Sequence, residues 1–169
     1  MKKKTNIVMG LAILFLTFVL GVISLPAALA DANQGESLLR EVHNGKVIFD
    51  VDTDPACPLS LGAYLLAISD YWDALEDKGV MAKFIVAIRG PSVTLAATGS
   101  PFTVMFALLA DKGIRIEVCQ YAMTNFGLTE EDMLETVHVV ENTFNSLVGY
   151  QTRGYSLIPI MPPWCPPPQ

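Results

Sequence analysis

The fold is decided by the apolar stretch Lys46-Val47-Ile48-Phe49-Asp50-Val51 and by the segments that follow it. Its β-branched and aromatic side chains are typical of a buried strand, which ends in the polar, proline-containing loop 52–58. Apolar residues then recur at three- and four-residue spacing from Ser60, a candidate cap, to Gly79, which indicates a helix. A second buried strand is predicted at 83–88. Strand, helix and strand in this order predict a right-handed βαβ unit with parallel strands.

The rest of the chain repeats this alternation of strand and helix. Ser, Thr or Asn residues suited to capping precede the predicted helices, and glycines close most of them. Strands that alternate with helices over one domain predict an α/β fold, with one parallel sheet covered by helices on both faces. The remaining predicted elements are a helix from Ser100 to Gly113, a strand at 114–118, a brief helix from Thr129, a strand at 136–140, a helix from Asn142 to Arg153 and a strand at 155–160.

The amino terminus has the features of a secretory signal peptide at residues 1–30. Three lysines at 2–4 precede an apolar run at 7–25, and Ala28-Leu29-Ala30 supplies a small-x-small cleavage pattern. The alternative is an uncleaved anchor, because a run of about 19 apolar residues can span a bilayer. Cleavage after Ala30 would leave one domain at 31–160 and a proline-rich tail at 161–169, in the periplasm or secreted, with no stable membrane insertion.

The charge balance argues against two classes of partner. The chain holds 11 Lys and Arg against 17 Asp and Glu, and removal of the leader leaves 8 basic residues and a net charge of −9. The acidic residues are spread along the chain, which indicates a solvated surface and not an acidic tail. An acidic protein of this kind does not suit nucleic acid or an anionic membrane surface as a partner.

The chain contains three cysteines, Cys57, Cys119 and Cys165. An odd number leaves at least one of them unpaired within a monomer. None has the spacing of a zinc or haem site, and no phosphate-binding or nucleotide motif occurs, so no cofactor and no metal is predicted. Cys165 lies in the proline-rich tail, where we expect an exposed thiol or an intermolecular link.

The candidate site lies where the first three predicted strands end, because parallel sheets place their sites at the carboxyl ends of strands. Cys119 ends the third strand, and Arg89 ends the second. Arg89 is the only cation predicted near this rim, where it would favour the thiolate of Cys119 and hold a persulfide or thiosulfonate anion. We expect Cys119 to lie in or beside a pocket formed with the loops 52–58 and 89–93.

Four segments carry a family resemblance: Arg89-Gly90-Pro91-Ser92-Val93, the run 113–123, the run 139–147 and Gln151-Thr152-Arg153-Gly154-Tyr155. Their order and spacing resemble the DsrE/DsrF-like family of sulfur-relay proteins. The resemblance implies a three-layer α/β/α sandwich around a five-stranded parallel sheet in the order 4-3-2-1-5. It also implies assembly as a homotrimer or homohexamer. Arg89 stands where the family frequently has a histidine.

The resemblance also implies a function. Active family members carry sulfur as a persulfide on a cysteine at the position of Cys119, so this chain would be an exported sulfur carrier or sulfurtransferase. Its partners would be sulfur donor and acceptor proteins or small thiols. The alternative is a non-catalytic binding or assembly module in which Cys119 is structural.

Cys57 is the second candidate thiol, because its loop leaves the first strand at the same rim. The second strand lies between the strands that lead to Cys57 and Cys119, so their Cα atoms are expected about 10 Å apart. That distance is beyond disulfide range without loop movement. We therefore expect both cysteines to be free thiols.

Overall fold

The computed structural model describes residues 42–161, all within one compact unit. The predicted signal peptide at 1–30, Cys165 and nearly all of the predicted tail lie outside the described residues. No helix within 42–161 combines the length and the hydropathy that crossing a membrane requires. The elements in chain order are β1 (Gly45–Val51), α3 (Pro58–Glu76), β2 (Ala82–Ile88), the 3-10 helix η1 (Gly90–Ala96), α4 (Thr103–Asp111), β3 (Arg115–Cys119), α5 (Gln120–Asn125), the 3-10 helix η2 (Glu130–Asp132), β4 (His138–Val140), α6 (Thr143–Gln151) and β5 (Ser156–Ile160).

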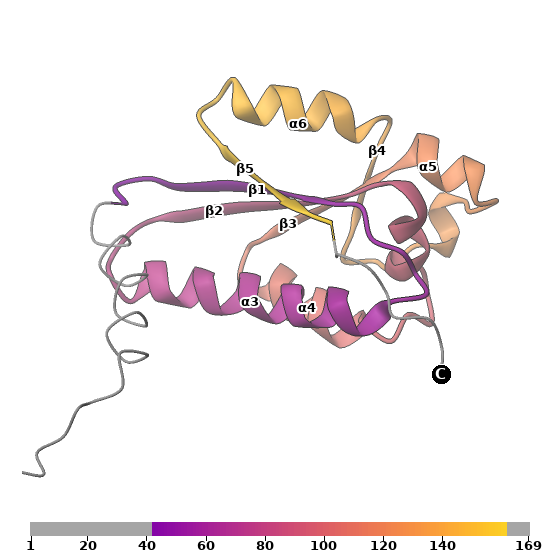
Figure 1. The fold of residues 1–169 in the computed structure, drawn as a ribbon, viewed down its shortest axis with the longest axis horizontal. Coiled ribbons are helices and arrows are strands. Elements are labelled where there is room, and N and C mark those ends of the chain that lie inside the picture. The colour runs from indigo at the N-terminus through magenta and orange to yellow at the C-terminus, as the bar shows by residue number, and fades with distance from the viewer. Residues whose placement is uncertain (1–41, 162–169) are drawn as a thin grey trace, which may run out of the picture. The chain divides into compact units, whose positions relative to one another are not determined.

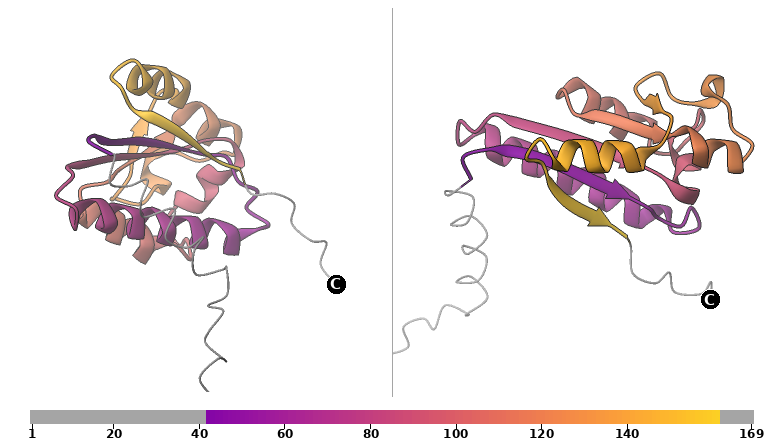
Figure 2. Two further views of the ribbon diagram at one scale, coloured as in Figure 1. Left: turned by 60° about the vertical axis from the view of Figure 1, so that its left-hand side comes forward. Right: turned by 90° about the horizontal axis from the view of Figure 1, so that it is seen from above.

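The five strands form one sheet in the order β4-β3-β2-β1-β5. Every neighbouring pair is parallel, which confirms the predicted sheet and its order. Helices α3 and α4 cover one face of the sheet and α6 covers the other, so the molecule has three layers (Figure 1). The two further views show the same arrangement, with α5 beyond the carboxyl end of β3 (Figure 2).

The core lies on both faces of the two central strands, β1 and β2. On the face covered by α3, the Phe84 ring lies 5.3 Å from Phe49 and 5.2 Å from both Tyr71 and Trp72. On the opposite face Ile48, Ile85 and Ala87 pack with Leu147 of α6. Strands buried on both faces are expected to be almost continuously apolar, which is why β1 and β2 were readable from sequence.

Two helices begin at other residues than predicted. Helix α3 starts at Pro58 with Cys57 as its N-cap residue, two residues before Ser60. Proline suits the first turn because its fixed φ matches the helix and its missing N–H would be unpaired there anyway. Helix α4 starts at Thr103, because Ser100 forms a turn instead: its Oγ accepts from the backbone N–H of Phe102 at 3.1 Å.

Of the shorter elements, η2 and β4 were predicted, whereas η1 and α5 were not. Thr129 and Asp132 form the capping box of η2, and the Asn142 side chain accepts from the backbone N–H of Phe144 at 2.9 Å. Strand β4 is confirmed but spans only His138–Val140, because Val137 instead closes a turn onto the Leu134 carbonyl.

One charged side chain is buried under α6. Glu117 of β3 is 2% exposed, and its Oε1 accepts from Arg115 Nε at 2.7 Å and from the Tyr150 hydroxyl at 2.9 Å. Burial first, and then the hydrogen bond to Glu117, raises the pKa of Tyr150 above its ordinary value of 10.0. Tyr150 therefore ties α6 to the sheet in its protonated form.

Replacing Tyr150 with phenylalanine is expected to lower the free energy of unfolding by about 1–2 kcal/mol, because Glu117 loses one of its two donors. Tyr155→Phe is the matched control, since the Tyr155 ring packs 5.0 Å from the Tyr150 ring and its hydroxyl donates no hydrogen bond to another residue of the described part of the chain. Above pH 10, Tyr150 ionises in the unfolded state before it ionises in the folded state. The free energy of unfolding that the wild type gains from this hydrogen bond should therefore decrease there. Urea unfolding at neutral and alkaline pH measures both effects, and equal losses in the two variants would contradict the assignment.

Candidate functional site

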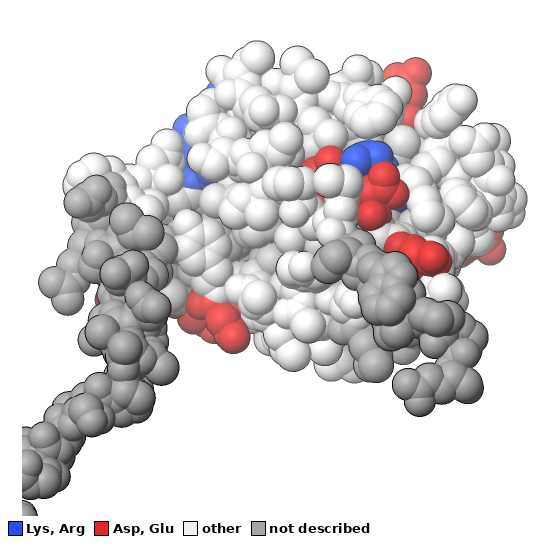
Figure 3. All heavy atoms as spheres, in the orientation of Figure 1, with Lys and Arg blue, Asp and Glu red and all other residues white. Residues whose placement is uncertain are grey.

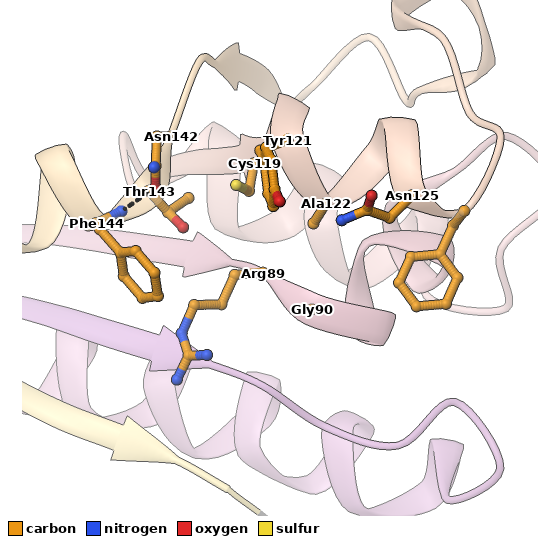
Figure 4. Close-up of a pocket in the computed structure, with 10 residues that line it drawn as sticks. Arg89, Gly90, Cys119, Tyr121, Ala122, Asn125, Asn142, Thr143 and Phe144 are labelled. Carbon is orange, nitrogen blue, oxygen red and sulfur yellow. Dashed lines mark hydrogen bonds between the residues drawn. The ribbon is translucent and has the colours of Figure 1, made fainter.

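A pocket of about 270 Å³ opens at the carboxyl ends of β2 and β3. Elements far apart in the chain build it: the start of η1, the end of β3, the short helix α5 and the first turn of α6 (Figure 4). Parallel strands direct their carboxyl ends to one rim, which is where ligands bind in open α/β sheets. Its lining residues are Arg89, Gly90, Cys119, Tyr121, Ala122, Asn125, Phe126, Asn142, Thr143 and Phe144.

Cys119 lines this pocket, at the last residue of β3 and the N-cap of α5. Its thiol is free, and the residue is 4% exposed. Figure 4 shows its sulfur on the side of the residue that faces Thr143. The structure thus places Cys119 at the predicted rim and in a pocket, with little of the residue open to solvent.

Arg89 also lines the pocket, but its guanidinium group is bound to two carboxylates of the β1 end. Its Nε donates to Asp50 Oδ1 at 2.7 Å, its Nη2 to Asp50 Oδ2 at 3.1 Å and its Nη1 to Asp52 Oδ2 at 2.6 Å. The hydrogen bond to Asp50 is the main cause that raises the pKa of Arg89 above its ordinary value. Figure 4 shows the guanidinium group turned toward β1 and away from Cys119.

The backbone at Gly90 is fitted to this ion pair. Gly90 has a φ of 57°, a left-handed conformation that favours glycine, and a Cβ there would lie 2.4 Å from Asp52 Oδ1. A side chain at position 90 would displace Asp52 from Arg89. The Arg89 guanidinium carbon also lies 5.6 Å from the centre of the Phe144 ring, so the same cluster contacts the first turn of α6.

Cys57 does not carry a free thiol. It is disulfide-bonded, so the expectation of two free thiols was wrong, although the inference that Cys57 and Cys119 do not pair agrees with the free state of Cys119. The spacing of the strands bears only on a bond between Cys57 and Cys119, and not on a bond from Cys57 to another cysteine. None of residues 52–57 of the predicted loop lines the pocket, in contrast to the prediction, because the loop after β1 leads into α3.

Helix α6 supplies pocket residues that the sequence analysis missed. Asn142, Thr143 and Phe144 follow β4, whereas the predicted site comprised only the loops after the first three strands. The rule that pointed to those loops applies equally to the fourth strand, so the signal was present. Thr143 is 1% exposed, and its hydroxyl has no hydrogen-bond partner within the part of the chain that the structure describes.

The described residues show no group of three or more His, Cys, Asp or Glu side chains able to hold a metal ion. Acidic side chains are scattered over the face in Figure 3, and the basic ones are few. Nothing in the pocket lining resembles a phosphate-binding loop or a metal-ligand set, so its chemistry depends on one thiol, two hydroxyls, two amides, one guanidinium group and aromatic rings.

The comparison with protein families finds that the model of the DsrE/DsrF-like family matches residues 91–160. That range contains Cys119 and most of the pocket lining, and the match confirms the resemblance seen in the sequence. The comparison with curated proteins finds no match.

Solved structures share the fold. A protein of unknown function from Methanobacterium thermoautotrophicum, MTH1491, has a TM-score of 0.60 at 22% identity, over 67% of this chain and 96% of that one. The conserved protein of unknown function BT1422 from Bacteroides thetaiotaomicron has a TM-score of 0.53 at 20% identity, over 68% of this chain and 94% of that one. The ychN protein from E. coli has a TM-score of 0.53 at 15% identity, over 69% and 98%. Identities this low establish the shared fold alone.

Proposed function

We propose that this chain, whose residues 91–160 match the model of the DsrE/DsrF-like family, is a sulfur carrier that holds sulfane sulfur as a persulfide on Cys119. The observation that supports the proposal most is the position of Cys119: a free thiol at the carboxyl end of a parallel strand, lining a pocket within the family-matched range. The family match supports a role in sulfur relay. The persulfide and its transfer to a partner protein or small thiol are the proposed step.

The chemistry that a carrier needs is modest. A thiolate attacks a sulfane sulfur, and the resulting persulfide is later attacked by an acceptor thiolate. The pocket gives the incoming donor a place to lie against the Cys119 sulfur, and no metal or cofactor takes part in either transfer. The same two steps serve a carrier or a sulfurtransferase, which differ only in the acceptor.

A second candidate function is a non-catalytic binding or assembly module on the same fold. The observation that favours it is the 4% exposure of Cys119, since buried cysteines often serve as small apolar core residues. The binding of Arg89 to Asp50 and Asp52 points the same way, because that cation is already neutralised. Incubation of the protein with a sulfane donor separates the two functions. A carrier accumulates about one cyanide-releasable sulfur per chain, and a binding module accumulates none.

We also propose that the protein works as a homo-oligomer and outside the cytoplasm. Large apolar side chains are exposed at the pocket mouth, on α6 and on the edge strand β5, and a partner copy would cover such surfaces. Those residues are Tyr121, Phe126, Phe144, Val148, Leu157 and Ile158. Light scattering on residues 31–169 should give a trimer or larger assembly, whereas a clean monomer at micromolar concentration would contradict self-association. Export rests on residues 1–30, outside the described residues.

A further inference from the structure

The pocket beside Cys119 carries no available positive charge. Arg89 is the only Lys or Arg among its lining residues, and its guanidinium group faces two carboxylates within 3.1 Å. Because it contains one cation and two carboxylates, the Asp50–Arg89–Asp52 cluster has an excess of negative charge. A small dianion entering the pocket would therefore meet repulsion rather than a counter-charge.

The walls of the pocket are largely apolar. The Tyr121 and Phe126 rings come from the α5 side and the Phe144 ring from α6, with Ala122 between Tyr121 and Asn125. Tyr121 is 69% exposed and Phe144 is 58% exposed, so both residues are open to solvent, while Cys119 is buried at 4%. The pocket volume of about 270 Å³ is several times the volume of about 30 Å³ that a water molecule takes up in the liquid. The pocket is therefore larger than one added sulfur atom requires.

An uncharged polar group lies beside the thiol. The Thr143 hydroxyl is buried without a partner among the described residues, whereas neighbouring Asn142 already accepts from Phe144. A buried hydroxyl normally has a hydrogen-bond partner. Figure 4 shows this hydroxyl on the pocket side of α6, where it can donate to a sulfur atom held next to Cys119.

We infer that the pocket selects sulfane donors whose sulfur is carried on an uncharged organic group, and that it discriminates against thiosulfate. The inference rests on the proposed function and narrows its substrate class. The aromatic rings of the pocket wall contact the organic group, and the Thr143 hydroxyl donates a hydrogen bond to the sulfur. The Asp50–Arg89–Asp52 cluster disfavours the binding of anions.

The transfer from an organic hydropersulfide, R–S–SH, balances without an oxidant. The Cys119 thiol first gives its proton to solvent, and the thiolate attacks the terminal sulfur of the donor. The S–S bond of the donor breaks as a new S–S bond forms to Cys119 Sγ. The leaving thiolate R–S⁻ keeps the electron pair and takes up a proton, and the transferred sulfur retains its oxidation state.

The test compares the initial rates at which benzyl hydropersulfide and thiosulfate load Cys119, followed by intact mass. Each rate is divided by that donor's rate with the urea-unfolded protein, which removes the intrinsic reactivity of the donor. The folded protein should favour the benzyl donor by about tenfold or more, the effect of burying part of one aromatic group. Added salt should speed thiosulfate loading by screening the repulsion.

Variants locate the preference. Phe144→Ala should lower the ratio of the two normalised rates about tenfold, and Phe126→Ala repeats the test on the opposite wall if the first variant fails to fold. Val148→Ala is the control, because Val148 is an exposed α6 residue outside the pocket lining. An equal or greater normalised rate for thiosulfate would overturn the inference and leave the carrier function standing. Loading by neither donor would overturn both.

Discussion

Replacing Cys119 with alanine is expected to abolish the uptake of sulfane sulfur, because no other free thiol occurs among residues 42–161. The loss should be complete, since the persulfide sulfur has no second free thiol to bind within residues 42–161. Stability should fall by only about 1 kcal/mol, the usual cost of removing one buried atom. Cyanide-releasable sulfur measured beside far-UV circular dichroism separates loss of the site from loss of the fold.

Cys119→Ser is the matched control for this prediction. Serine keeps nearly the same volume at the end of β3 but forms no S–S bond, so it should lose sulfur as completely as alanine does. Retention of sulfur in both variants, with loss in Cys57→Ala or Cys165→Ala, would move the active role to another cysteine.

Replacing Arg89 with methionine is expected to lower the free energy of unfolding by about 2–3 kcal/mol. Removing one partner of a fully buried ion pair costs about 3–5 kcal/mol, and an exposed pair contributes about 1 kcal/mol at most. This cluster lies between those limits, with side-chain exposures of 21% for Arg89, 11% for Asp50 and 29% for Asp52. Methionine keeps an unbranched stem equivalent to the Cβ-to-Nε part of Arg89 and leaves the two carboxylates without their cation.

Arg153→Met is the control, because the Arg153 guanidinium contacts only the Tyr150 ring, at 5.9 Å, and forms no salt bridge within the described chain. The hydrogen bond to Asp50 raises the pKa of Arg89 above its already high ordinary value, so the guanidinium stays charged and its contribution to stability is whole throughout the neutral and mildly alkaline range. The decrease in the free energy of unfolding caused by Arg89→Met should therefore not vary through titration of Arg89 over about pH 6–9. Full stability with strongly reduced sulfur loading would instead restore the thiolate-supporting role predicted from the sequence.

Most of the fold could be predicted from the sequence because burial on both faces makes the central strands continuously apolar. Strands β1 and β2 were placed to within one residue, and the capping residues Thr129 and Asn142 were identified correctly. Helix starts were less predictable. Ser60 and Ser100 were both plausible caps, but Pro58 and the turn at Ser100 decided the actual boundaries.

The candidate site was predicted in part. Cys119 was placed at the rim because its strand ends there. In the sheet, Ile88 pairs with both Val51 and Val118. The residues that follow these three, Asp52, Arg89 and Cys119, therefore lie in one row. Sequence could suggest that Arg89 and Cys119 are near each other, but not which neighbour the long Arg89 side chain would bind. The two carboxylates on the β1 side offered the stronger hydrogen bonds.

The most direct test of the account is the location of the sulfur after the wild-type protein has been loaded. The protein is incubated with a sulfane donor, its thiols are blocked without reduction, and its peptides are mapped by mass spectrometry. The account predicts that the peptide containing Cys119 gains the mass of one sulfur atom, while the Cys57 peptide remains in its disulfide. An unmodified Cys119 peptide, with sulfur on another cysteine or on none, would contradict it.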